Sequence, residues 1–202
     1  MKKIICLCLS ILILSSAFVV TASAASTHTV VKGDSLWKIA KTYQIGLSEI
    51  KAANPTIKNY NLIYPGQIIN IPTHDSSVTA YEQEVARLVN EIRRSRGLSP
   101  LTLDWQLSRV ARYKSQDMKD KGYFSHTSPT YGSPFNMMKS FGITYKTAGE
   151  NIAKGYSTPA AVVDAWMNSP GHRANILNSS FTHIGVGYVA EGSYWTQMFV
   201  GR

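Results

Sequence analysis

Two histidines and one glutamate are the side chains of this sequence best suited to chemistry. His126, Glu150 and His172 lie in separate segments, each rich in glycine, proline or small polar residues that fix backbone turns. The segments read YFSHTSPTYG, AGENIA and WMNSPGHRANIL. Two imidazoles could hold a divalent metal such as zinc, and a carboxylate could act as general base for a water molecule. Because no local spacing such as His-x-x-x-His links them, each is also a candidate structural residue.

The elements between residues 81 and 202 must bring these three side chains together. Apolar periodicity predicts several helices followed by a terminal β-hairpin. Five helices are expected. The first begins at a Thr79–Glu82 capping box and ends at Gly97, the second runs from Asp104 to Gly122, and the third from Ser133-Pro134 to Gly142. The fourth begins at Thr158-Pro159 and the fifth at Ser169-Pro170. This leaves His126 in a loop and His172 in the first turn of a helix. Helices first and a hairpin last indicate an α+β domain whose helices cover a mostly antiparallel sheet.

The predicted hairpin has two different faces. It runs from Thr182 to Ala190, turns at Glu191-Gly192 and returns from Tyr194 to Val200. Ile184, Val186 and Tyr188 share one face of its first strand, while Gly185 and Gly187 leave room on the other.

The N-terminus has the pattern of a secretory signal peptide. Two lysines precede an apolar stretch over residues 4–20, and Ala22-Ser23-Ala24 offers a cleavage site after Ala24. The apolar run is short for a membrane span, so we expect no transmembrane anchor after signal removal. Both cysteines, Cys6 and Cys8, lie in the removed segment. The mature chain then has no thiol, which excludes disulfides and cysteine nucleophiles.

Charge and length bound the mature chain further. Removing the two signal lysines from 21 Lys and Arg leaves 19 against 12 Asp and Glu, a formal net charge of +7. The positive charges are spread along the chain without a recognition motif, so no nucleic-acid partner is expected. Anionic wall polymers or a membrane surface suit an exported basic protein better, and a soluble domain that is basic without functional reason is equally consistent.

Two unequal units are expected in the 178 residues that remain. We place the boundaries at 1–24 for the signal peptide, 28–72 for the first unit, 73–79 for a linker and 80–202 for the second unit. The linker is polar and follows a proline. Its only apolar residue is Val78, so the two units are expected to function independently.

The first unit reads as strand, helix, helix, strand. HTVVKGDSLWKIAKTYQIGLSEIKAANP followed by LIYPGQIINIP closely resembles a LysM module, and the match covers the unit. The resemblance implies binding of N-acetylglucosamine-containing glycans such as peptidoglycan. Its groove would lie between two loops formed by Gly33, Asp34, Ser35 and Leu36 on one side and Asn61, Leu62 and Ile63 on the other. We expect Trp37, Ile39 and Ile50 to fill a small core.

The second unit resembles the CAP superfamily of cysteine-rich secretory proteins, antigen 5 and pathogenesis-related 1. The resemblance rests on the three segments quoted first, with FTHIGVGYV and YWTQMFVG, and implies an α-β-α sandwich with a central groove. His126, Glu150 and His172 match three members of a two-His, two-Glu tetrad. Ser169 stands where the second glutamate usually lies, which weakens both metal binding and acid-base chemistry.

The polar neighbours of these three residues read as scaffold. We expect Asn151 to hold backbone, Arg173 and Asn175 to support His172, and His183 to be structural.

These observations predict a secreted protein of the cell wall or spore envelope, held on peptidoglycan by the LysM module. The CAP domain would serve as an interaction or effector unit with an unknown partner, in a role that family context places in sporulation or spore-envelope assembly. Two alternatives stay open. One is a metal-assisted wall hydrolase or protease using His126, Glu150 and His172, with His126 and His172 as metal ligands; the other is a lipid-binding CAP domain. The missing carboxylate favours binding over catalysis.

Overall fold

The computed structural model describes residues 26–73 and 76–202. The predicted signal segment with its cleavage site and two cysteines, and the linker residues 74–75, lie outside the described residues. Within the two described ranges, no helix combines the length and apolar character needed to cross a membrane.

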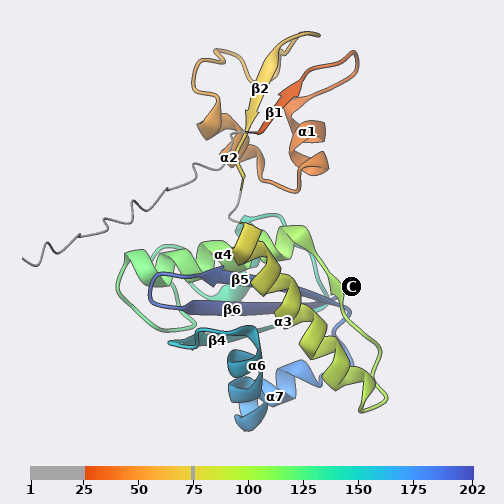
Figure 1. Ribbon diagram of the computed structural model, residues 1–202, viewed down its shortest axis with the longest axis vertical. Coiled ribbons are helices and arrows are strands. Elements are labelled where there is room, and N and C mark those ends of the chain that lie inside the picture. Colours follow the sequence, from red (N-terminus) through yellow and green to blue (C-terminus); the bar gives the residue numbers. More distant parts are fainter. Residues whose placement is uncertain (1–25, 74–75) are drawn as a thin grey trace, which may run out of the picture.

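The N-terminal unit has the expected order of strand, helix, helix and strand. Its elements are β1 (Ser26–Thr29), α1 (Leu36–Thr42), α2 (Leu47–Ala53) and β2 (Ile68–Ile71). The two strands pair antiparallel, with Ser26 opposite Ile71. Helix α1 starts at Leu36 because the Ser35 hydroxyl accepts a hydrogen bond from the backbone N–H of Lys38. Figure 1 shows the two helices packed beside the two-stranded sheet.

One expectation about the core of this unit is wrong. Ile39 and Ile50 are buried, but Trp37 is 52% exposed. The reason is helix geometry: Leu36, Ile39 and Ala40 form the buried face of α1, and Trp37 falls outside that face. Trp37 is therefore a large aromatic side chain on the surface of a small module and not part of its core.

The C-terminal unit is an α-β-α sandwich, as expected. Its helices are α3 (Ser76–Arg94), α4 (Trp105–Asp120), α5 (Pro134–Ser140), α6 (Pro159–Asn168) and α7 (Pro170–Ile176). Its strands are β3 (Thr102–Leu103), β4 (Thr147–Lys154), β5 (His183–Val189) and β6 (Tyr194–Gly201), in the sheet order β3-β5-β6-β4. Only the short β3 pairs parallel. In Figure 1, α4 covers one face of the sheet, and α3 and α6 lie on the other.

The two faces of β5 pack as the sequence predicts. Ile184, Val186 and Tyr188 join the core with α3, α6 and α7. On the opposite face, a Cβ on Gly187 would lie 2.2 Å from backbone atoms of α4, and one on Gly185 would lie 2.3 Å from them. Bare glycine backbone is what allows α4 to lie this close to the sheet.

Helix α3 begins earlier than the capping pattern predicts. It starts at Ser76, and Val78 packs against the core beneath it, so the apolar face of the helix continues for another turn. Glu82 does not serve as a cap. Its side chain is buried, where it accepts hydrogen bonds from Arg112 at 2.9 Å and from the backbone N–H of Tyr188 at 3.1 Å.

Strand β4 was not anticipated, and it changes the setting of Glu150. The glycine and small polar residues around Glu150 indicate a turn, whereas the structure pairs AGENIA antiparallel with β6, with Glu150 opposite Met198. The segment lacks the strict alternation that marks a half-exposed strand because most of it is buried on both faces.

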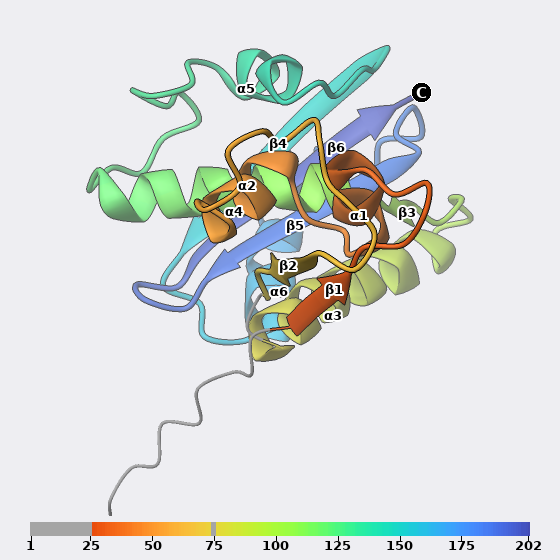
Figure 2. The same cartoon turned by 90° about the horizontal axis from the view of Figure 1, so that it is seen from above.

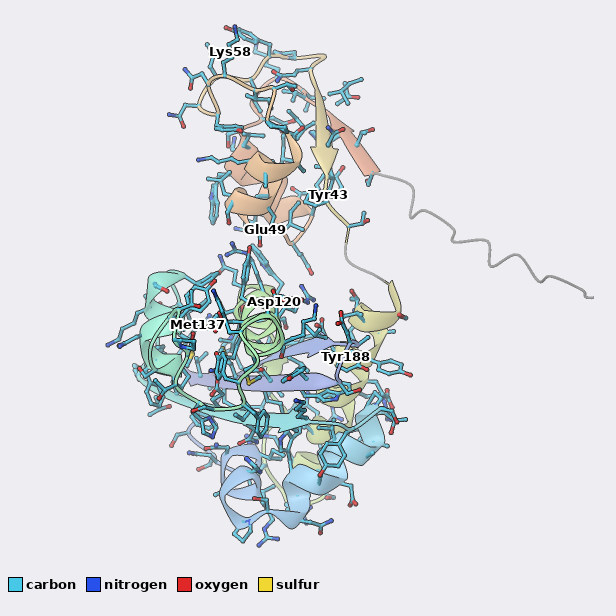
Figure 3. The ribbon with its side chains drawn as sticks, turned by 90° about the vertical axis from the view of Figure 1, so that its left-hand side faces the viewer. Tyr43, Glu49, Lys58, Asp120, Met137 and Tyr188 are labelled. Carbon is cyan, nitrogen blue, oxygen red and sulfur yellow. The ribbon has the colours of Figure 1, made fainter. Side chains whose placement is uncertain are left out.

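A polar contact joins the two units. The guanidinium of Arg109 on α4 donates to the Ser48 hydroxyl at 2.8 Å and to Glu49 of α2 at 2.8 Å. Figure 2, viewed from above, shows α2 over α4, and Figure 3 shows Glu49 at the end of the N-terminal unit that faces the C-terminal one. Gly46 also lies close to this contact, because a Cβ added to Gly46 would come within 2.2 Å of the Arg109 guanidinium. Nothing in the linker composition indicated this contact.

Candidate functional site

Helix α4 holds the loop that carries His126. Lys114 is fully buried, and its ammonium group donates to the Ser125 carbonyl at 2.7 Å, the His126 carbonyl at 2.9 Å and the Tyr123 hydroxyl at 3.1 Å. Burial lowers the pKa of Lys114, an effect opposed by the charges of Glu150 and Asp117. A buried cation thus fixes the backbone on which His126 is mounted.

Asp117, one turn along α4, holds the rest of the same loop. It accepts hydrogen bonds from the hydroxyls of Thr130 at 2.6 Å, Tyr123 at 2.6 Å and Ser128 at 2.7 Å. Burial acts to raise its pKa, but these hydroxyl donors outweigh it and hold the pKa of Asp117 below its ordinary value. Both ends of the loop are therefore anchored on one helix.

Glu150 and His126 form a hydrogen-bonded pair. The ring N–H at Nδ1 of His126 donates to Oε1 of Glu150 across 2.7 Å. The Glu150 side chain is only 1% exposed, while that of His126 is 53% exposed. Burial raises the pKa of Glu150, and the hydrogen bond from His126 and the charge of Lys114 partly offset this. Oε2 of Glu150 is buried without a hydrogen-bond partner among the described residues.

His172 is placed by a network of amides. The Asn151 side chain donates to the His172 carbonyl at 3.1 Å, and Asn175 donates to Oδ1 of Asn151 at 2.8 Å and to the Glu150 carbonyl at 3.2 Å. Asn151 also donates to Oε1 of Gln197 at 3.1 Å, leaving Nε2 of Gln197 buried without a partner in the described structure. Burial and then the nearby charge of His126 lower the pKa of His172. Through Asn151, the neighbour of Glu150, the three residues are brought into one region of the C-terminal unit.

Arg173 and His183, the other two residues expected to be scaffold, both make hydrogen bonds close to their own position in the chain. Arg173 donates to the Met167 carbonyl at 3.1 Å and so ties α7 back to α6. His183, at the start of β5, makes a 2.7 Å hydrogen bond with the Thr182 hydroxyl.

The donor set of this site does not fit a metal ion. Among residues 26–73 and 76–202, no group of three or more His, Cys, Asp or Glu side chains is arranged to hold one. Nδ1 of His126 pairs with Glu150, so that ring has only Nε2 left for a ligand, and His172 would add one more nitrogen. Ser169, at the junction of α6 and α7, supplies no carboxylate. What the arrangement offers instead is a shielded carboxyl group with a free oxygen, beside an imidazole that reaches solvent.

A second candidate site lies in the N-terminal unit, in a hollow of about 210 Å³ that we call the loop groove. Its walls are Asp34, Ser35, Leu36, Trp37, Leu47, Lys51, Tyr60, Asn61 and Ile63. Five of the seven residues predicted to bind a glycan line this groove. Gly33 and Leu62 do not.

The first wall of the loop groove is held rigidly. Asp34 accepts hydrogen bonds from the backbone N–H of Val31 at 2.9 Å and from Nε2 of His28 at 2.8 Å. These hydrogen bonds, the backbone one first, lower the pKa of Asp34. Gly33 has φ +94° with open space where a Cβ would lie, so the turn itself requires glycine there.

Comparison with known proteins identifies both units. The model of the cysteine-rich secretory protein family, CAP, matches residues 86–201, more than half of the chain. The chain belongs to the CAP family. A LysM domain model matches residues 28–72, so a LysM domain precedes the CAP domain. The loop groove is a feature of that LysM domain, and the His126–Glu150 pair is a feature of the CAP domain.

Individual relatives match parts of this chain. Protein YkwD of Bacillus subtilis is 69% identical over 127 residues, which cover 63% of this chain and 49% of YkwD. The N-acetylmuramoyl-L-alanine amidase sle1 of Staphylococcus aureus is 32% identical over 78 residues, 39% of this chain and 23% of the amidase. A solved extracellular protein from Bacillus anthracis with an SCP domain is 36% identical with a TM-score of 0.60, covering 68% of this chain and 47% of that one. This chain thus spans about half or less of each relative.

Sequence reasoning missed two residues of this LysM–CAP chain. Lys114 follows Leu107, Val110 and Ala111 at helical spacing on the buried face of α4. A lysine on an apolar stripe was a signal for a buried, partnered cation. Trp37 is the opposite case: it lies off the apolar face of its helix, which indicates an exposed aromatic side chain.

Proposed function

We propose that this chain is a secreted cell-wall protein in which the LysM domain binds N-acetylglucosamine-containing glycan, such as peptidoglycan, through the loop groove. The observation that carries the proposal is the groove itself, a hollow between two loops in a domain of the LysM family. Its walls combine apolar side chains with the amide of Asn61 and the hydroxyls of Ser35 and Tyr60. Such a mixture suits sugar rings, which have apolar faces and polar edges.

In this proposal the CAP domain is the interaction or effector unit, and its surface around His126 meets the partner. The half-exposed imidazole of His126, held by its hydrogen bond to the buried Glu150, gives that partner a hydrogen-bonding site. A place in sporulation or spore-envelope assembly is part of the same proposal.

A second candidate function is hydrolysis without a metal. The observation that favours it is the 2.7 Å contact between His126 and a buried Glu150, whose pKa is raised by burial toward the range useful for general acid-base catalysis. His126 also reaches solvent. The absence of a second carboxylate at Ser169 leaves this candidate behind the first.

Separating the two domains tests the proposal. Each domain has its own apolar core, built around Ile39 and Ile50 in the LysM domain and around Trp166 and Trp195 in the CAP domain. Fragments 26–73 and 76–202 are therefore expected to fold separately. Incubated with purified peptidoglycan, 26–73 should sediment with it and 76–202 should remain mostly in solution, because the loop groove is in the first fragment.

The same incubation separates binding from catalysis. Muropeptides released by the full chain but not by its Glu150→Gln variant would support the hydrolase. Equal sedimentation of the two fragments would contradict the assignment of glycan binding to the LysM domain.

A further inference from the structure

Two residues of the loop groove also line a second hollow at the edge of the LysM domain. This hollow of about 340 Å³ lies between the two domains, and we call it the interdomain hollow. Trp37, Leu47 and Ser48 of the LysM domain form one side, and Trp105, Gln106 and Phe141 of the CAP domain are on the other. Trp37 and Leu47 also line the loop groove. The two hollows therefore adjoin along these shared side chains.

The shared side chain Trp37 is placed to contact a ligand on both sides. It is 52% exposed and lies outside the core face of α1, so burial in the LysM core does not account for it. An indole ring presents a flat apolar face and a polar N–H edge, which suits molecules that are apolar on one face and polar at the rim. Trp105, the first residue of α4, brings a second indole to the interdomain hollow from the CAP domain.

The contact between the domains fixes the shape of this hollow. Arg109 lies on its wall and is held by Ser48 and Glu49 on the LysM side. On the CAP side its guanidinium lies 5.1 Å from the centre of the Phe141 ring, a cation–π contact. One side chain thus connects the two walls.

The wall chemistry points to an uncharged ligand. Of the described residues that line the interdomain hollow, only Arg109 is charged, and Glu49 already pairs with it. The other groups are aromatic faces, the Gln106 amide and the hydroxyls of Ser48 and Ser140. Pyranose rings with hydroxyl and acetamido substituents match these surfaces better than a charged peptide does.

We infer that the interdomain hollow is a second subsite for the same glycan. A chain of N-acetylglucosamine units bound in the loop groove continues past Trp37 and contacts Trp105 and Gln106 of the CAP domain. This inference rests on the proposed function of the loop groove and extends it. The contact with the CAP domain makes the binding affinity depend on the length of the glycan. Longer chains bind more tightly because the second contact is intramolecular once the first has formed.

Titration calorimetry with N-acetylglucosamine oligomers of four and eight units tests this on residues 26–202. Two variants act on the CAP wall alone. Trp105→Ala removes the indole, and Gln106→Glu adds a charge in the first turn of α4, where an acidic residue favours the helix. Tyr156→Ala, which removes another partly exposed aromatic residue of the CAP domain, away from the hollow, is the matched control.

The unchanged chain and Tyr156→Ala are expected to bind the octamer about tenfold more tightly than the tetramer. A small part of this gain arises because the octamer can place several different stretches of four units in the loop groove. Trp105→Ala and Gln106→Glu should lose most of this gain and keep the tetramer affinity. Persistence of the full gain in both variants, or equal affinities for the two oligomers in the unchanged chain, would overturn the inference alone. If neither oligomer binds, the proposed function of the loop groove fails as well.

Discussion

Lys114→Met is expected to lower the free energy of unfolding by about 3 kcal/mol, the range for removing one partner of a buried charge network. Methionine fills the space of the lysine stem but donates no hydrogen bond. The carbonyls of Ser125 and His126 lose their donor, and the buried Glu150 and Asp117 lose a neighbouring cation. Each loss leaves polar groups shielded from water without compensation, which is why the change destabilises.

Urea unfolding followed by circular dichroism measures this effect. Lys139→Met is the matched control, since Lys139 is exposed on α5 and its replacement should change stability by less than about 0.5 kcal/mol. Amide hydrogen exchange adds a local readout, in which Lys114→Met should accelerate exchange in the loop around His126. A midpoint equal to that of the control would show that Lys114 does not hold this loop.

Gly187→Ala is expected to destabilise the CAP domain by about 3 kcal/mol or more, at the upper end for overpacking. The new methyl group would lie 2.2 Å from the backbone of Ala111 and Arg112. A side chain could rotate away, but the backbone of α4 can yield only if the whole helix moves off β5. That movement would also displace Lys114 and Asp117, which anchor the His126 loop.

Thermal unfolding compares this variant with Gly171→Ala. Gly171 lies in the first turn of α7 with open space where a Cβ would be, so alanine there should raise the free energy of unfolding by about 0.5 kcal/mol. The two substitutions are chemically identical and are expected to have opposite signs. Similar melting temperatures for both variants would mean that α4 does not pack against β5 as described.

Local pattern was enough to predict most elements of this fold. Capping residues and glycine or proline at helix ends located α4, α5, α6 and α7 closely. The alternation of β5 predicted one apolar face and one face left open by glycines, and α4 occupies the open face. Strand β4 escaped because it is buried on both sides, so it has neither strand alternation nor helical periodicity.

The sites depend more on contacts that are distant in sequence. Motif resemblance drew attention to His126, Glu150 and His172, but not to the cation beneath them. The lysine on the apolar stripe of α4 was visible in the sequence; its partners were not. The pairing of Glu82 with Arg112 and of Glu49 with Arg109 spans 30 and 60 residues. Neither follows from local spacing, because each depends on how separately folded elements pack.

Sedimentation with purified peptidoglycan, using a groove variant of residues 26–202, tests the central claim most directly. Asn61→Glu places a carboxylate on the wall of the loop groove, and Thr56→Glu adds the same charge at an exposed turn of the LysM domain outside the groove. Both positions are exposed, so both variants should fold as the unchanged chain does. The unchanged chain and Thr56→Glu are expected to sediment with peptidoglycan, and Asn61→Glu to bind about tenfold more weakly, as the loss of one or two hydrogen bonds to the glycan implies. Equal sedimentation of Asn61→Glu and Thr56→Glu would contradict the claim that the loop groove of the LysM domain holds this protein on the cell wall.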